Sequence, residues 1–160
     1  MSGPTRRQAL LLTGLGGLTT AGGLYWAYRP GGYLTQEARD LRALENDPMG
    51  AETILGHTAI HTDKPDLSTW HLKTPIISLD RYFRSKDDTP QDLKTELVSY
   101  AKKVGWSEKD QEYPDTNRWA GQHSNRTAND YMQLAITITT EHPDPSDPLH
   151  DSVAISLFYR

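Results

Sequence analysis

The chain of 160 residues contains no cysteine. This absence excludes disulfide bonds, thiolate nucleophiles, cysteine-ligated zinc and thioether-linked lipids. Acidic residues are also absent from the first 36 positions, although the whole chain carries 21 of them. All but three of the 17 lysine and arginine residues follow position 29, so acidic residues outnumber basic ones there. A domain of that charge lacks the basic surface that nucleic-acid binding requires, and we expect no nucleic-acid partner.

Catalytic motifs are absent as well. The serines have no G-x-S-x-G context, no glycine-rich phosphate loop follows a strand, and the H-E-x-x-H pattern of zinc hydrolases does not occur. His57 and His61 suggest a metal site at first sight. On one extended strand, however, they would lie about 13 Å apart, too far to share an ion. We therefore expect no catalytic residues and no cofactor.

The N-terminal segment is the most informative part of the sequence. Residues 8–28 form an uncharged run of 21 residues. A helix of that length spans about 31 Å, close to the hydrocarbon thickness of a bilayer. Tyr25, Trp26 and Tyr28 gather at its end, where aromatic rings favour the membrane interface. The pattern predicts a signal-anchor or transmembrane segment over residues 1–29, with the lipid bilayer as partner.

Arg6 and Arg7 precede the apolar run and set its expected orientation. Basic residues favour the cytoplasmic side, so we expect a single-pass protein of the cell membrane with its C-terminal domain outside the cytoplasm. The same arginine pair is also compatible with a twin-arginine export signal. Cleavage near Ala21 would instead release a secreted binding protein. Small residues at four-residue spacing in this run would allow helix pairing, hence a membrane protein partner or a homo-oligomer.

The remaining chain divides into a linker with a juxtamembrane helix, residues 30–50, and an external domain, residues 51–160. Thr35 is the expected cap of the first helix, which runs to about Glu45. A second helix is capped by Thr89, with Pro90 at its first position and Gly105 at its end. Trp106 is expected to fold back onto this helix end. Alternation of apolar and polar residues predicts strands at 52–62, 75–84, 118–122, 131–140 and 152–159.

These elements predict an α+β fold. An N-terminal transmembrane helix precedes a two-layer domain, in which one main amphipathic helix packs on a mostly antiparallel sheet of 4–5 strands. The second face of that sheet is polar and is expected to be solvent-exposed. Trp106 and Trp119 are expected in the core. Trp70, in a polar loop, is a candidate for ligand binding.

One loop carries the best candidates for a cation site. The segment 141–151 is rich in oxygen ligands and histidine, but lacks the spacing and the glycine of an EF-hand. A solvated connection is the simpler interpretation, and a metal-dependent envelope hydrolase is the alternative. The candidate ligands are His142, Asp144, Asp147, His150 and Asp151.

Three short motifs resemble a loose group of small actinobacterial membrane proteins of unknown function. They are Asp47-Pro48-Met49-Gly50, Gly105-Trp106 and Trp119-Ala120-Gly121. In that group an N-terminal anchor precedes one small external α+β domain, and no catalytic residues are established. The resemblance implies the same organisation here. Together with the composition, it favours a membrane-anchored, non-catalytic binding or accessory module of the cell envelope.

Overall fold

The computed structural model describes residue 32 and residues 35–67, 76–109, 115–124, 131–139, 144 and 146–159. Contacts divide the chain into two units, Met1–Arg39 with Asp66–Trp70 and Asp40–Pro65 with His71–Arg160. The first unit contains the start of helix α2 (Gln36–Asn46). There the Ala38 N–H donates to Thr35 Oγ1 over 3.3 Å, which confirms Thr35 as the helix cap.

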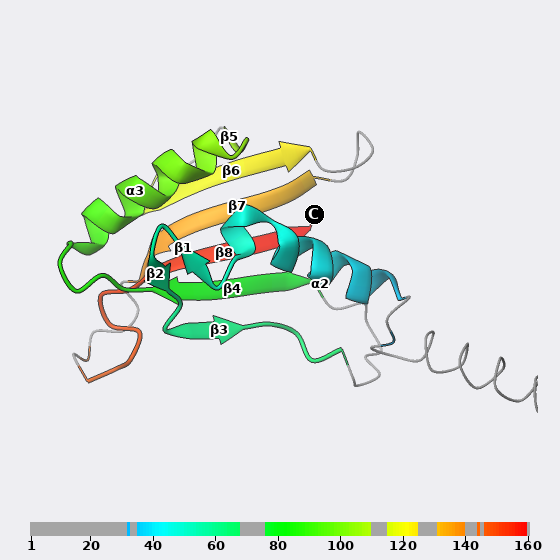
Figure 1. The fold of residues 1–160 in the computed structure, drawn as a ribbon, viewed down its shortest axis with the longest axis horizontal. Helices are drawn as coiled ribbons and strands as arrows, with labels where there is room; N and C mark the ends of the chain where they lie inside the picture. The colour runs from blue at the N-terminus through cyan, green and yellow to red at the C-terminus, as the bar shows by residue number, and fades with distance from the viewer. Residues whose placement is uncertain are drawn as a thin grey trace, which may run out of the picture. The chain divides into compact units, whose positions relative to one another are not determined.

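The second unit is built on a six-stranded antiparallel sheet with the order β3-β4-β8-β7-β6-β5 (Figure 1). Two short strands, β1 (Thr53–Ile54) and β2 (His57–Thr58), pair with each other as a separate hairpin. The six strands are β3 (His61–Asp63), β4 (Ser78–Phe83), β5 (Ser107–Glu108), β6 (Arg118–Ser124), β7 (Tyr131–Ile138) and β8 (Val153–Tyr159).

The α+β class is confirmed, but the expected count of 4–5 strands was too low. The expected single strand over residues 52–62 is divided among β1, β2 and β3. Leu55 and Gly56 adopt positive φ angles of 52° and 88° and form the turn between β1 and β2. Strand β5 was not predicted from the sequence. It has only two residues and directly follows Trp106.

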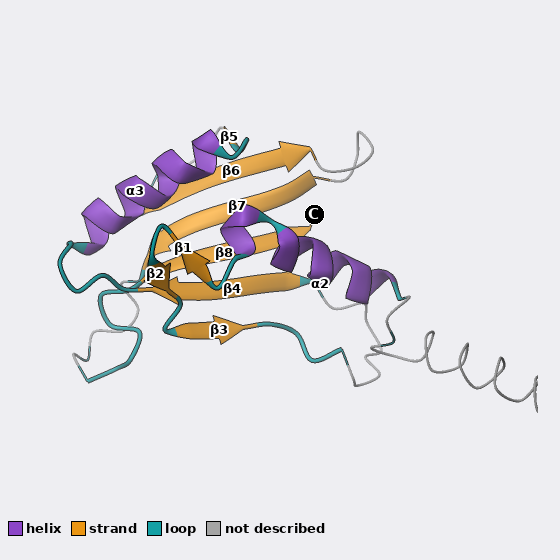
Figure 2. Cartoon of the chain, in the orientation of Figure 1, coloured by secondary structure: helices purple, strands orange, loops and turns teal. Residues whose placement is uncertain are grey.

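One face of the sheet is covered, and helix α3 lies over it (Figure 2). Leu79, Leu157 and Leu134 are aligned across β4, β8 and β7, and each is at most 1% exposed. Helix α3 (Pro90–Lys103) contacts β7 and β8 and buries Leu93 and Leu97. Each such burial contributes about 1.5–3 kcal/mol, so this layer is the main source of stability.

The predicted caps of α3 are confirmed. The Asp92 N–H donates to Thr89 Oγ1, and Thr89 donates to the Asp92 carboxylate in return. At the other end Gly105 has a φ of 104°, and its N–H donates to Lys102 O. The Trp106 N–H donates to Ala101 O over 3.0 Å, completing a Schellman motif.

A 3₁₀ turn, η1 (Pro48–Gly50), follows α2 and contacts β8. Gly50 lies so close to the helix that a Cβ atom there would be 1.9 Å from Leu44 O. Arg81 of β4 donates from Nε to Gly50 O over 2.8 Å and from Nη1 to Thr62 Oγ1 over 3.1 Å. This arginine therefore joins the turn, β4 and β3 on the covered face.

No helix among the described residues is long and apolar enough to cross a membrane. The predicted transmembrane segment over residues 1–29 lies outside the described residues.

Candidate binding face

Several residues singled out from the sequence lie outside the described part of the chain. They are Arg6, Arg7, Tyr25, Trp26, Tyr28, Trp70 and His142. Their predicted roles at the membrane interface, in ligand binding and in cation binding stay predictions.

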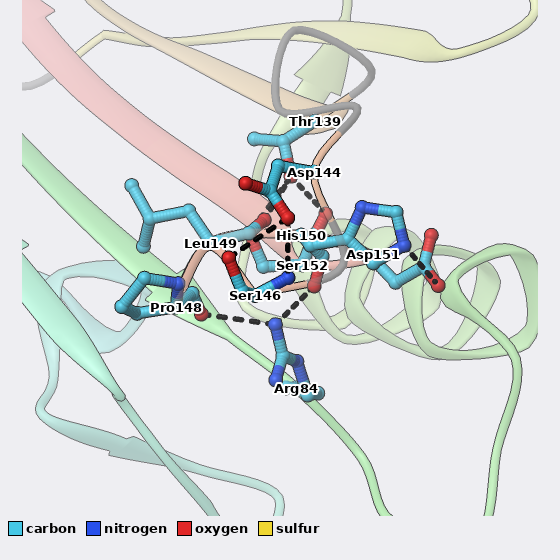
Figure 3. A network of polar contacts seen from close by, with 9 residues as sticks. All are labelled: Arg84, Thr139, Asp144, Ser146, Pro148, Leu149, His150, Asp151 and Ser152. Atoms are coloured by element: carbon cyan, nitrogen blue, oxygen red, sulfur yellow. Dashed lines mark hydrogen bonds and ion pairs between the residues drawn. The ribbon is translucent and has the colours of Figure 1, made fainter.

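The loop before β8 uses its polar groups to hold its own shape (Figure 3). Asp144 Oδ1 accepts from the backbone N–H and from the hydroxyl of Ser146, each over 2.8 Å. Because these two donors stabilise the carboxylate, the pKa of Asp144 lies below its ordinary value. Asp147 Oδ1 accepts from the Leu149 N–H over 2.7 Å. Both carboxylates therefore cap turns of the backbone.

The same loop is tied to its surroundings by backbone carbonyls. The Thr139 hydroxyl is shared between two carbonyl acceptors, Leu149 O at 3.0 Å and Ser152 O at 2.8 Å. Arg84 Nη2 donates to the carbonyls of Pro148, over 2.9 Å, and of His150. These bonds supply partners to the carbonyls of a segment without regular structure, some half-buried and some exposed.

The candidate cation ligands do not converge in the part of the chain that is described. His150 Nε2 lies 3.2 Å from Asp151 Oδ2, its neighbour in sequence. Asp144 and Asp147 face their own turns. Among the described residues no group of three or more histidine or carboxylate side chains is placed to hold a metal ion.

Histidines elsewhere in the described chain are distributed singly. His57 in β2 lies 3.5 Å from the Glu96 carboxylate of α3, and His61 in β3 packs against Tyr82 with its ring tilted by 53° and 5.6 Å between ring centroids. Because β2 and β3 belong to different sheets, His57 and His61 share no strand face. His123 lies 5.6 Å from the Trp106 ring, on the covered face.

Trp106 and Trp119 are core residues, as expected. Trp106 is 3% exposed and Trp119 is 7% exposed. Beside them an exposed pair joins α3 to β5, where Lys102 Nζ lies 2.8 Å from Glu108 Oε2. Lys102, and to a smaller extent the Trp119 indole N–H, lower the pKa of Glu108 below its ordinary value. The Trp119 indole nitrogen is buried, however, and its distance and angle to the described acceptors do not meet those of a hydrogen bond.

The surface that remains is the opposite side of the sheet, which we call the open face. Side chains alternate along a strand, so the residues between those of the covered face point to this side. Most of them are polar and half-exposed, in contrast to the fully buried apolar layer behind them. The open face comprises His61, Asp63, Ser78, Asp80, Tyr82, Ser107, Arg118, Ala120, Gln122, Gln133, Ala135, Thr137, Ala154, Ser156 and Phe158.

The open face carries small side chains on its central strands and charged side chains at its two ends. On the central strands, Ala135 and Ala154 are only 5% and 8% exposed. Asp63 and Asp80 are register partners at the β3–β4 end. At the β5–β6 end are Arg118 and also Lys109, which follows β5 and whose Nζ lies 3.5 Å from Gln133 Oε1. This charge separation was not predicted, because it depends on the order of the strands.

No protein family model matches the chain, and no curated protein or solved structure shows significant similarity to it. The residues of the chain themselves must therefore indicate its function. A two-layer α+β fold hosts many unrelated functions, so the chemistry of its surfaces decides between them.

Proposed function

We propose that this chain is a membrane-anchored, non-catalytic binding or accessory module of the cell envelope, and that it binds through the open face of its sheet. The observation that carries the proposal is the contrast between the two faces. One face is sealed by α3, η1 and their apolar side chains, whereas the other presents polar and aromatic groups on rigid strands. Rigid strands fix the positions of contacting groups before a partner arrives, which lowers the cost of binding.

The anchor is inferred from residues 8–28, whose uncharged run matches the thickness of a bilayer. Arg6 and Arg7 favour a cytoplasmic N-terminus, and the domain then lies outside. The resemblance to small actinobacterial membrane proteins supports the same arrangement. A secreted binding protein, released by cleavage near Ala21, is the competing outcome.

The non-catalytic assignment is supported by how the described polar groups are used. Asp144 and Asp147 accept hydrogen bonds from their own turns. His57 meets the Glu96 carboxylate, and His123 meets the Trp106 indole and the Gly105 carbonyl. A nucleophile with an adjacent base, the usual basis of hydrolysis, does not arise from these contacts.

Site-specific labelling tests the proposed surface, because a chain without cysteine gives no background. Thr137→Cys places a thiol on the open face, and Gln91→Cys places one on the exposed side of α3 as a control. We expect the thiol at 137 to react more slowly with a maleimide in native membranes than in the detergent-extracted, diluted protein. The thiol at 91 should react equally in both. Equal rates at 137 as well would refute a bound partner on the open face.

The same variants test the anchor and its orientation. A membrane-impermeant maleimide added to intact cells should label the thiol at 91, and the labelled chain should resist extraction from membranes by alkaline carbonate. Mass spectrometry of the native protein should find residues 1–29 retained. A mature N-terminus near Gly22 in a soluble fraction would establish the secreted form instead.

A further inference from the structure

The two carboxylates on the open face form an unfavourable pair. Asp63 of β3 and Asp80 of β4 are direct register partners, and like charges placed opposite each other destabilise a sheet. Within the described residues, neither carboxylate has a hydrogen bond or an ion pair. A cation supplied from outside the domain would relieve this repulsion.

The opposite end of the same face carries the matching charge. The Arg118 side chain is exposed and makes no hydrogen bond or ion pair with another described residue. Lys109 lies beside it, since the Lys109 N–H donates to Ala120 O. The open face thus has an acidic end on β3–β4 and a basic end on β5–β6, separated by the neutral strands β8 and β7.

We propose that the open face binds a second copy of this chain, face to face about a two-fold axis that runs parallel to the strands between β8 and β7. This inference rests on the proposed function and names the partner. Such an axis brings β3 over β5 of the second copy and β4 over β6, because the strand order is reversed across it. The acidic end of each copy then meets the basic end of the other, as an isologous contact requires.

The register gives the individual contacts. Asp63, Asp80 and Lys109 belong to one row across the sheet, which also contains Ser156 and Ala135. The two-fold axis therefore brings Asp63 opposite Lys109 of the second copy. In the adjacent row, Tyr82 comes opposite Arg118 of the second copy, where a guanidinium interacts favourably with the ring face.

The middle of the face permits the approach. Ala135 comes opposite Ser156 of the second copy, and Thr137 comes opposite Ala154. Small side chains at the axis allow two sheets to pack at about 10 Å with aligned strands. The six strands together contain 33 residues. At about 4.8 Å between strands and 3.3 Å per residue, they give a face of roughly 520 Å². Two such faces bury about 1,000 Å², at the low end for a specific interface, so the dimer is expected to be reversible.

Charge-reversal variants of the full-length chain, studied in detergent or nanodiscs, test this arrangement. Wild-type protein should form a dimer as its concentration is raised to about 100 μM. High salt should weaken the dimer, since screening reduces exposed charge contacts. The double variants Asp63→Lys/Asp80→Lys and Lys109→Asp/Arg118→Asp should each bind themselves about tenfold more weakly or worse. An equimolar mixture of the two variants should form a heterodimer, because both sets of charges are then complementary. Light scattering after size exclusion measures all three.

The matched control, Glu52→Lys/Asp87→Lys, makes the same two acid-to-lysine changes at exposed positions outside the open face. It should dimerise like the wild type. Circular dichroism confirms that each variant is folded. A wild-type chain that stays monomeric, a dimer unaffected by either double variant, or a mixture without rescue would each overturn the inference. If the thiol at position 137 is still protected in membranes, the proposed function stands with a different partner. If it is not, both fail.

Discussion

The indole Nε1 of Trp106 lies 3.4 Å from Oδ1 of Asp47, although the two residues are 59 positions apart in the chain. The same carboxylate oxygen accepts from the Met49 N–H over 2.8 Å and thereby caps η1. Trp106 is the residue that closes the Schellman motif of α3. One polar contact therefore joins the end of α3 to the start of η1 on the covered face.

Truncation of Trp106 should be strongly destabilising because the side chain is 3% exposed. Trp106→Ala is expected to lower the free energy of unfolding by about 3–5 kcal/mol. Trp106→Phe keeps most of the packing but loses the bond to Asp47, and should cost about 1 kcal/mol. Urea unfolding followed by circular dichroism measures both. A Phe variant as unstable as the Ala variant would show that Phe does not preserve the packing.

Close packing at Gly50 makes a second prediction. Gly50→Ala would place a Cβ atom 1.9 Å from the backbone oxygen of Leu44, so the turn must move. We expect a loss of about 3 kcal/mol, at the upper end for overpacking. Gly105→Ala is the matched control, because its Cβ would meet only the His123 ring at 3.6 Å. That variant should lose about 1–2 kcal/mol from its positive φ alone. Equal losses in the two variants would contradict the steric argument.

The exposed pair of Lys102 and Glu108 predicts a specific pH dependence. The pKa of Glu108 is lowered in the folded state, mainly by the hydrogen bond from Lys102 and to a smaller extent by the Trp119 indole N–H. The pair therefore stabilises the fold above the ordinary glutamate pKa, and this contribution is lost as the pH falls through the lowered value. Lys102→Met should raise the pKa of Glu108 toward its ordinary value. A carboxyl-carbon NMR titration measures it, and an unchanged pKa would show that Lys102 is not the cause. Because both side chains are exposed, overall stability should change little.

Local signals were sufficient for much of this fold. The caps of α3 were predictable because Thr89, Pro90 and Gly105 act on the backbone within a few residues of themselves. The apolar alternation in β7 was similarly clear, since Leu134 and Ile136 are both buried, although the structure also buries Ala135 between them. In both cases the information lies within one turn of helix or one strand.

The turn between β1 and β2 could not be predicted in the same way. Leucine rarely adopts a positive φ, so Leu55 gave no turn signal, and Gly56 alone was compatible with a continuous strand. The position of β3 against β4 then depends on pairing with residues 17–21 positions away. For the same reason the opposition of Asp63 to Asp80, which defines the acidic end of the open face, required the strand order and register.

The hydroxyls of Thr139 and Ser152 give a final prediction. Ser152 is fully buried, and Thr139 Oγ1 lies 2.8 Å from both the Ser152 carbonyl and the Ser152 hydroxyl. Thr139→Val keeps the shape but removes the hydroxyl shared by the Ser152 and Leu149 carbonyls. Because these carbonyls keep the Thr139 and Ser152 N–H groups as donors, the substitution should cost about 0.5–1.5 kcal/mol. Thr137→Val, two residues earlier on the same face, removes a hydroxyl that has no hydrogen bond among the described residues and should be close to neutral. Thermal unfolding of the two variants checks this, and equal stabilities would show that the Thr139 hydroxyl does not hold the loop.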